Sequence, residues 1–257
     1  MQILLVHSLA SHGTASMKAM MSVLGTRVLP VPSLLLTGLT NVPGHQKVAV
    51  DLEPMIKGAL EIARQQNQRL VLYIGYLGEA SQVDILVEAI DDYREAISKV
   101  IVDPVSGDHG RLYVKPEIVK RWPDLLSRAD WAFPNFTELS LYAGFELGME
   151  VEVYRAIEAF EKRFPDLSFV ATSIPSPQQK IGLFLKKGRE KLKHEHERLA
   201  QNFGGTGDVF AAYFILYHLI KHITPSESLI LASNETCGII RSSIEAKQAF
   251  LQLFPKE

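Results

Sequence analysis

Residues 70–108 read LVLYIGYLGEASQVDILVEAIDDYREAISKVIVDPVSGD, and this stretch decides the fold class. A continuous apolar run occupies 70–74, a segment with helical spacing follows at 82–97, and a second apolar run at 100–103 ends in Asp103. Strands that are apolar at every position are typical of a parallel sheet covered on both faces, with a helix crossing between neighbours. We therefore predict a strand–helix–strand unit here, with polar residues just beyond each strand.

The same alternation extends toward both ends of the chain. The sequence predicts further strands at 2–6, 27–31, 131–133 and 167–171, and a loop over 33–48. It predicts helices at 14–24, 52–66, 115–127, 136–143, 150–163, 207–222 and 225–245. An antiparallel hairpin is expected from 181–185 and 190–196. We expect one α/β domain, 1–257, with three layers (α/β/α) and a central, mostly parallel sheet that has an antiparallel edge.

Composition limits the classes of partner. The 257 residues are 47% hydrophobic and carry a formal net charge of -2, and the basic cluster at 186–198 is interrupted by three glutamates. These features argue against a nucleic-acid partner. The single cysteine, Cys237, allows neither a disulfide within the chain nor a two-thiolate metal site, and it fits a reducing, cytoplasmic setting. The longest apolar stretch, 209–219, is about half a membrane span, so we expect no membrane insertion.

Polar motifs directly follow several of the predicted strands. Parallel sheets bind ligands beyond the carboxyl ends of their strands, so these motifs mark one edge of the sheet as a candidate site. They are His7-Ser8, Gly75-Tyr76, Asp103-Pro104, Pro134-Asn135 and Thr172-Ser173.

The strongest single motif is the glycine-rich segment Gly204-Gly205-Thr206-Gly207-Asp208, which directly precedes an apolar helix. Glycines let the backbone approach an anion closely, and the free N–H groups at a helix N-terminus suit a phosphate. A carboxylate in the same turn is placed to take a proton from a nucleophilic hydroxyl. The alternative is a tight turn with an aspartate favoured by the helix dipole. The segment is not a P-loop, because no Gly-Lys-Ser/Thr follows.

Three further motifs each have a functional and a structural interpretation. Asp103, at a strand end within the segment 103–108, can face a metal ion or can belong to a turn of Asp, Pro and Gly. Asn135 and Glu138 fit a helix-capping box, and Glu138 can also organise a Mg²⁺-nucleotide. The glycines around Tyr76 at 75–78 suit a pocket for a flat ring, although such a tyrosine more often packs in the core.

Taken together and in chain order, the segments 75–78, 103–108, 134–138, 172–173 and 205–208 resemble the pyridoxal kinase branch of the ribokinase superfamily over nearly the whole chain. The resemblance implies a ribokinase-like fold and an ATP-dependent kinase. That kinase phosphorylates the 5′-hydroxymethyl group of a vitamin B6 vitamer, which is pyridoxal, pyridoxamine or pyridoxine. It also implies Mg²⁺, a possible monovalent cation (K⁺), a homodimer and a cytoplasmic location.

The resemblance also implies roles for individual residues. Asp208 is the general base, and the backbone N–H groups of Gly205, Thr206, Gly207 and Asp208 form the anion hole. On the donor side, the triphosphate contacts are Asn135, Thr172 and Ser173, and the cation-side residues are Asp103 and, through water, Glu138. The vitamer-side residues are Ser8, Thr40 and Tyr76.

The chain departs from the family pattern after the first strand. Pyridoxal kinases often carry Asp or Ser with other polar groups there, whereas this chain reads His7-Ser8-Leu9-Ala10, of which only Ser8 fits. The related hydroxymethylpyrimidine kinases remain an alternative, although their Gly-Thr-Gly-Cys ending is replaced here by one with Asp208. A ribokinase-fold protein that binds nucleotide or vitamer without turnover is the alternative from another class.

Overall fold

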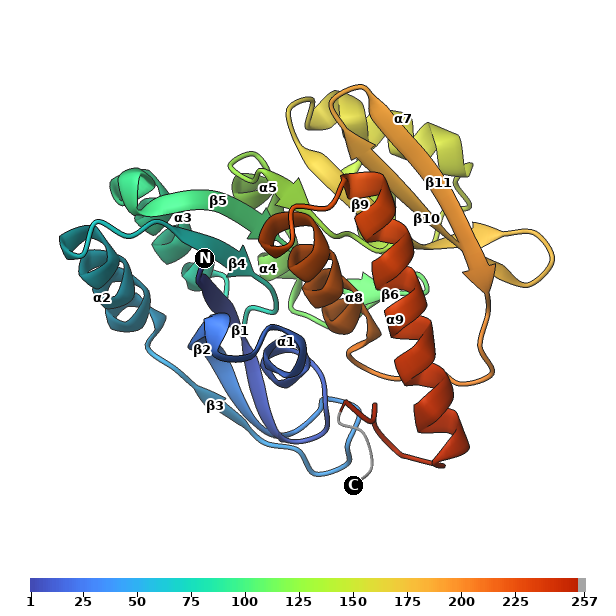
Figure 1. Ribbon diagram of the computed structural model, residues 1–257, viewed down its shortest axis with the longest axis horizontal. Helices are drawn as coiled ribbons and strands as arrows, with labels where there is room; N and C mark the ends of the chain where they lie inside the picture. Colours follow the sequence, from blue (N-terminus) through green and yellow to red (C-terminus); the bar gives the residue numbers. More distant parts are fainter. Residues whose placement is uncertain (254–257) are drawn as a thin grey trace.

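The computed structural model describes residues 1–253, and a nine-stranded sheet runs through the middle of this part of the chain (Figure 1). Its strand order is β11-β10-β9-β8-β5-β4-β1-β2-β3. The strands are β1 (Ile3–His12), β2 (Val28–Gly38), β3 (Lys47–Ala49), β4 (Leu70–Ile74), β5 (Ile97–Val102), β8 (Trp131–Ala132), β9 (Ser168–Ser176), β10 (Lys180–Lys187) and β11 (Glu190–Glu197). The six strands from β9 to β2 are parallel, whereas β10, β11 and β3 pair antiparallel at the two edges.

Helices cover both faces of this sheet, as the continuous apolar strands predict. One face carries α2 (Leu52–Gln65), α3 (Ser81–Asp92), α4 (Pro116–Val119), α5 (Trp122–Leu126), α6 (Phe136–Tyr142) and α7 (Val153–Arg163). The other carries α1 (Met17–Leu24), α8 (Thr206–Ile215) and α9 (Pro225–Glu245), which lie together in front of the sheet in Figure 1. The predicted three-layer α/β/α fold is therefore confirmed.

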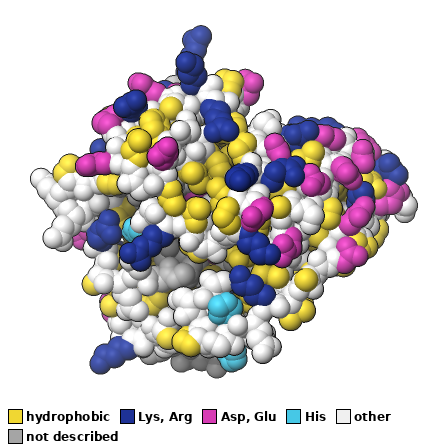
Figure 2. All heavy atoms as spheres, turned by 180° about the vertical axis from the view of Figure 1, so that it is seen from behind, with side chains coloured by type: hydrophobic (Ala, Val, Ile, Leu, Met, Phe, Trp, Pro, Cys, Tyr) yellow, Lys and Arg dark blue, Asp and Glu magenta, His cyan; other side chains and the backbone are white. Residues whose placement is uncertain are grey.

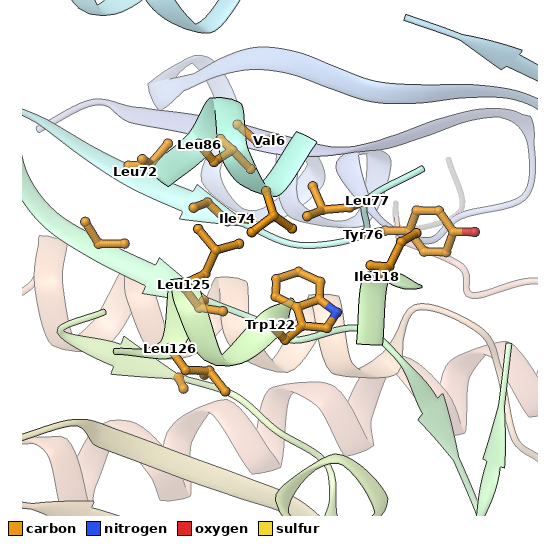
Figure 3. Close-up of a cluster of buried hydrophobic side chains, with 14 of the residues drawn as sticks. Val6, Leu72, Ile74, Tyr76, Leu77, Leu86, Ile118, Trp122, Leu125 and Leu126 are labelled. Carbon is orange, nitrogen blue, oxygen red and sulfur yellow. The ribbon is translucent and has the colours of Figure 1, made fainter. Parts of the chain in front are cut away.

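The central strand β1 shows why two separate cores form. Leu4 and Val6 face the first helical layer, while Ile3 and Leu5 face the second, and all four are completely buried. Alternate side chains of a strand point to opposite faces, so an all-apolar strand is stable only between two apolar layers. Figure 3 shows the first core around Trp122, with Leu72 and Ile74 of β4 packing toward helices α3 and α5.

The outer surface of these layers is charged. Figure 2 shows acidic and basic side chains interspersed over the face opposite to that of Figure 1. Ion pairs link α3 to α5 and the turn after it, as Arg121 contacts Asp84 at 2.6 Å and Arg128 contacts Asp91 at 2.9 Å. Exposed pairs of this kind contribute about 0–1 kcal/mol each, so the two apolar cores supply most of the stability. In the part of the chain that the structure describes, no helix has the length and apolar character needed to cross a membrane.

The structure corrects several predicted boundaries. The segment 33–48 is not all loop: β2 continues to Gly38 and β3 pairs with it, which gives the sheet a second antiparallel edge. Two prolines in β2 obscure this, and Pro32 lies where the β1–β2 register shifts, between His7 and Ser8. Proline is tolerated at such irregularities because it cannot donate a ladder hydrogen bond.

Other corrections concern helix ends and small elements. The predicted helix at 115–127 is instead two short helices, α4 and α5. Pro123 lies in the first turn of α5, a position where proline is tolerated, whereas it would break a continuous helix. The predicted helix at 82–97 ends at Asp92 and is followed by a 3₁₀ turn, Arg94–Ala96. The last turn of the segment 207–222 is a π-helix, Leu216–Ile220. Two short antiparallel strands, β6 (Gly107–Asp108) and β7 (Arg111–Leu112), follow β5 in the chain and form a separate two-stranded sheet.

Candidate active site

The glycine-rich segment packs against the turn that precedes α1. Gly205 is the N-cap of α8 at a φ of 94°, and a Cβ atom there would lie 2.7 Å from both the Thr14 carbonyl oxygen and the Ala15 Cα. Only glycine therefore allows this left-handed conformation and this close approach. The first N–H groups of α8 have no acceptor within the helix and carry the positive end of its dipole. These features suit an anion at this turn.

Asp208 lies in the first turn of α8 and is held by two donors from the N-terminal part of the chain. Its Oδ1 is 3.0 Å from His7 Nε2, and its Oδ2 accepts the Ser16 backbone N–H at 2.6 Å. The Ser8 hydroxyl donates to Ser16 Oγ at 2.9 Å, which brings Ser8 into the same group. Asp208 is only 9% exposed. The structure thus joins the C-terminal motif to the middle of β1, because this strand continues to His12 and contains His7 and Ser8, which the sequence placed after the strand end.

Asp103 follows β5 and is buried beside Asp208. The Tyr73 hydroxyl donates to Asp103 Oδ2 at 3.1 Å. Burial, with the nearby negative charge of Asp208, raises the Asp103 pKa from 3.8 to about 7. A carboxylate in this setting is stabilised by a cation, since the cation offsets both the desolvation and the repulsion.

Glu138 closes the predicted capping box of α6 and is also buried. Its Oε2 accepts the Asn135 backbone N–H at 3.0 Å, and the Asn135 side chain accepts the Glu138 N–H at 3.1 Å. Its Oε1 accepts the Ser106 backbone N–H at 2.8 Å, so both oxygens already have backbone donors. Burial raises the Glu138 pKa well above its ordinary value, and Asp103 adds to the shift. The capping interpretation is therefore confirmed.

These acidic side chains do not form a ready-made metal cage. Among residues 1–253, no three His, Cys, Asp or Glu side chains come together as a metal-binding cluster. The Asn135 amide also has a structural role, because its Nδ2 donates to the Gly107 carbonyl at 2.7 Å. Metal binding at Asp103 and Glu138 thus requires ligands from elsewhere, and water or a substrate phosphate can supply them.

A cavity of about 460 Å³ opens directly in front of the anion-binding segment. Thr206 and Gly207 line one end, together with Thr172 and Ser173 at the end of the parallel part of the sheet. Its other walls include apolar side chains such as Ile181, Leu183, Phe203, Phe210 and Ile240. Ligand pockets commonly combine this size, an apolar lining and a few polar groups at one end. The arrangement suits a flat base with a phosphate chain.

Ser233 is a cavity residue that the sequence motifs do not reveal. It lies on α9, is 2% exposed, and among the residues that the structure describes its hydroxyl makes no well-formed hydrogen bond and has only the Cys237 thiol, one turn further along the helix, as a weak neighbour. A buried hydroxyl without a well-formed hydrogen bond costs free energy, so a ligand in the cavity is a natural partner for it. A lone serine in the middle of a helix gives no signal in the sequence.

The vitamer-side residues of the sequence prediction do not all lie together. Ser8 is next to Asp208 through Ser16, whereas the Tyr76 ring packs near Ile118 at the edge of the first core (Figure 3). Tyr76 is 8% exposed, and its carbonyl accepts the Ser33 hydroxyl at 2.5 Å. Thr40 is exposed in the loop after β2. The next residue of that loop, Asn41, lines the cavity.

The chain is similar to known proteins in sequence and in fold. The sequence profile of the family described as phosphomethylpyrimidine kinase matches residues 20–253. A pyridoxine/pyridoxal/pyridoxamine kinase of Bordetella avium is 30% identical over 215 residues, which cover 77% of this chain and 68% of the relative.

Two solved structures share the fold. A Bacteroides thetaiotaomicron protein, provisionally described as a phosphomethylpyrimidine kinase and crystallised with pyridoxal, is 26% identical with a TM-score of 0.84, covering 94% of this chain and 88% of that one. Pyridoxal kinase from Leishmania donovani, in complex with ADP and pyridoxamine, is 23% identical with a TM-score of 0.81, covering 95% and 87%.

Fold and site together define a small-molecule phosphotransferase that uses an alcohol group as acceptor. The chain belongs to the phosphomethylpyrimidine kinase family and, within it, to the pyridoxal kinase branch. The resemblance drawn from the five sequence motifs is therefore confirmed.

Proposed function

We propose that the protein uses ATP to phosphorylate the 5′-hydroxymethyl group of pyridoxal, pyridoxamine or pyridoxine. The observation that carries the proposal is Asp208, fixed by two donors in the same turn as Thr206 and Gly207, which line the cavity. The 30% identical relative from Bordetella avium, named for these three vitamers, supports the choice of substrate.

In the proposed reaction, each part of the site has one task. Asp208 accepts the proton of the substrate hydroxyl as its oxygen attacks the terminal phosphorus. The N–H groups from Gly205 to Asp208 hold the transferred phosphoryl group and stabilise its charge in the transition state. Thr172 and Ser173 line the donor cavity beside this segment, where they contact the phosphate chain. Asn135 completes the donor side by holding Gly107 and α6 in place.

The residues present fit a Mg²⁺ ion. Two buried carboxyl groups with raised pKa values, Asp103 and Glu138, offer the oxygen chemistry that Mg²⁺ prefers. Both Glu138 oxygens accept backbone N–H groups, so Glu138 would act through metal-bound water. The ion would neutralise charge on the phosphate groups. A monovalent cation such as K⁺ near Asp103 belongs to the same proposal.

The vitamer side of the proposal includes Ser8, Thr40 and Tyr76. Ser8 is supported by its short path to Asp208 through Ser16. The Tyr76 ring lies at the edge of the first core, and Thr40 lies in the loop whose next residue, Asn41, borders the cavity. A homodimer and a cytoplasmic location follow from the family resemblance, and light scattering of the purified protein tests the first.

One screen tests the substrate. ATP consumption is measured with pyridoxal, pyridoxamine, pyridoxine, hydroxymethylpyrimidine and several sugars, with and without Mg²⁺. We expect Mg²⁺-dependent turnover of at least one B6 vitamer. Turnover of hydroxymethylpyrimidine alone would favour the second candidate, which the family description supports. ATP binding without any turnover would favour a non-catalytic binding protein.

A further inference from the structure

His7 is the side chain at the centre of the site that the proposed reaction does not use. It lies on β1, directly before the register shift against β2, and is 1% exposed. Its ring stacks on Tyr73 with a centroid distance of 6.3 Å and an interplanar angle of 14°. A Cβ atom on Gly75 would lie 2.3 Å from the His7 Cδ2 atom, so the glycine leaves the space that the ring fills. His7 therefore has one packed position.

The hydrogen bonds of the ring assign its tautomer. The Ser8 backbone N–H donates to His7 Nδ1 at 2.9 Å, so this nitrogen must present a lone pair. In a neutral imidazole with an acceptor at Nδ1, the proton is on Nε2. That nitrogen is 3.0 Å from Asp208 Oδ1, to which it donates. The backbone of β1 thus sets which ring nitrogen faces the carboxylate.

Asp208 receives this bond together with a second one from a different element. His7 holds Oδ1 and the Ser16 backbone N–H holds Oδ2, so the carboxylate is fixed at both ends in the first turn of α8. Each oxygen keeps a second lone pair for a substrate hydroxyl. Hydrogen bonds to an ionised group are stronger than those between neutral groups, so the two donors define the orientation of the carboxylate.

We propose that His7 is a positioning residue for Asp208: its neutral imidazole, locked between Tyr73 and Gly75, orients the carboxylate for proton abstraction. The proposal rests on the role of Asp208 as general base. His7 makes its contact with the carboxylate and transfers no proton. If His7 only filled space, its function would require neither a proton on Nε2 nor a hydrogen bond to Asp208.

Kinetics of His7→Leu, His7→Gln, Asp208→Asn and the double variant His7→Leu/Asp208→Asn test the proposal. The free energy of a hydrogen bond to a charged group corresponds to a change in rate of about 10- to 100-fold. His7→Leu should therefore lower kcat by that factor. The KM values for ATP and vitamer should stay within about three-fold, because His7 acts on the transition state through Asp208. His7→Gln, which retains an N–H donor, should recover several-fold over His7→Leu. His12→Leu, an exposed position of the same strand, is the matched control.

The double variant separates positioning from general damage. If His7 acts through Asp208, adding His7→Leu to Asp208→Asn should cost less than about three-fold further, because the group it orients is already gone. Full additivity of the two losses would overturn the proposal, as would a His7→Leu enzyme with wild-type kcat. An Asp208→Asn enzyme with wild-type kcat would instead overturn the proposed base.

The tautomer is measured directly on the wild-type protein. Long-range ¹H–¹⁵N correlation spectra of histidine-labelled protein, with the His7 signal assigned by its loss in His7→Gln or His7→Leu, should show a proton on Nε2 and a lone pair on Nδ1. A neutral ring protonated on Nδ1 would overturn the proposal, because Nε2 would then have no hydrogen to donate to Asp208.

Discussion

The donor and acceptor ends of the active site are built in different ways. In the proposed donor end, the anion contacts come from backbone, namely the α8 N–H groups and the left-handed Gly205, and a single short motif specifies them. The proposed acceptor end uses side chains from three separate elements: Ser8 within β1, Thr40 in the loop after β2 and Tyr76 after β4. A phosphate needs the same geometry in every enzyme of this kind, whereas an acceptor is recognised by groups that only the tertiary structure brings together.

The largest expected effect concerns Asp208, where the two ends meet. Asp208→Asn keeps the shape and should lower kcat by about 10²–10⁴-fold, the usual contribution of a positioned general base. Affinity for the nucleotide should change little, because the anion is held by backbone. Steady-state kinetics and nucleotide binding on one preparation measure both, and a kcat within a few-fold of wild type would remove Asp208 from the base role.

The next effect sharpens the role of charge at the donor end. Glu138→Gln keeps one acceptor oxygen, but its NH2 group replaces the second oxygen and faces a backbone N–H, so stability should fall by about 1–3 kcal/mol. Activity should fall at least about ten-fold, because a neutral amide binds a hard cation or its water poorly, and high Mg²⁺ should restore part of it. Melting temperature and the Mg²⁺ dependence of kcat/KM decide the matter. An unchanged Mg²⁺ profile would leave Glu138 as a helix cap alone.

The buried carboxyl of Asp103 predicts an unusual pH dependence of stability. Its pKa of about 7 in the folded protein exceeds the ordinary 3.8, so the folded state retains a proton that the unfolded state releases. In a chelator, the free energy of unfolding should therefore decrease as pH rises from about 4 to 7. Asp103→Asn should flatten this slope, leaving the contribution of Glu138. Urea denaturation across this pH range measures it, and equal slopes for both proteins would contradict the prediction.

The smallest effects compare two residues of the acceptor end. Ser8→Ala removes a hydroxyl near Asp208 and should raise the vitamer KM several-fold, the usual size for one neutral hydrogen bond. Tyr76→Phe keeps the packed ring and should change KM by less than about two-fold. Vitamer titrations at saturating ATP compare the two, and the reverse order would mean that the Tyr76 hydroxyl, not Ser8, contacts the vitamer.

The sequence predicts the parts of this molecule that are local in the chain. The apolar run 70–74 and the helix 225–245 have the predicted bounds, and the capping box of Asn135 and Glu138 forms as expected, because each depends on residues within one segment. Strand β3 is missed because it is three residues long and all of them are exposed, so no hydrophobic pattern marks it.

The site was predictable to the extent that strand ends share one edge of the sheet. Asp103 follows β5 as that rule predicts, whereas His7 and Thr172 lie inside β1 and β9, which continue beyond the predicted strands. The rule also does not say which side chains touch. The contact between His7 and Asp208 depends on the β1–β2 register shift and on the space at Gly75, and both appear only in three dimensions. The weakly bonded hydroxyl of Ser233 is likewise a property of packing.

Hydrogen bonds between the N-terminal and C-terminal parts of the chain indicate that the candidate site forms late during synthesis. His7 and Asp208 are 201 residues apart, and the Thr14 hydroxyl donates to the Leu251 carbonyl at 2.8 Å across 237 residues. Contacts between residues so far apart in the sequence form late in folding, because the conformational entropy of the long intervening chain must be lost before the contact forms. A nascent chain that still lacks α8 leaves His7 and the Ser16 N–H without their partner carboxylate. Ribosome-bound chains should therefore remain inactive until nearly the whole sequence has emerged, and activity itself reports that the first strand has met the last helices.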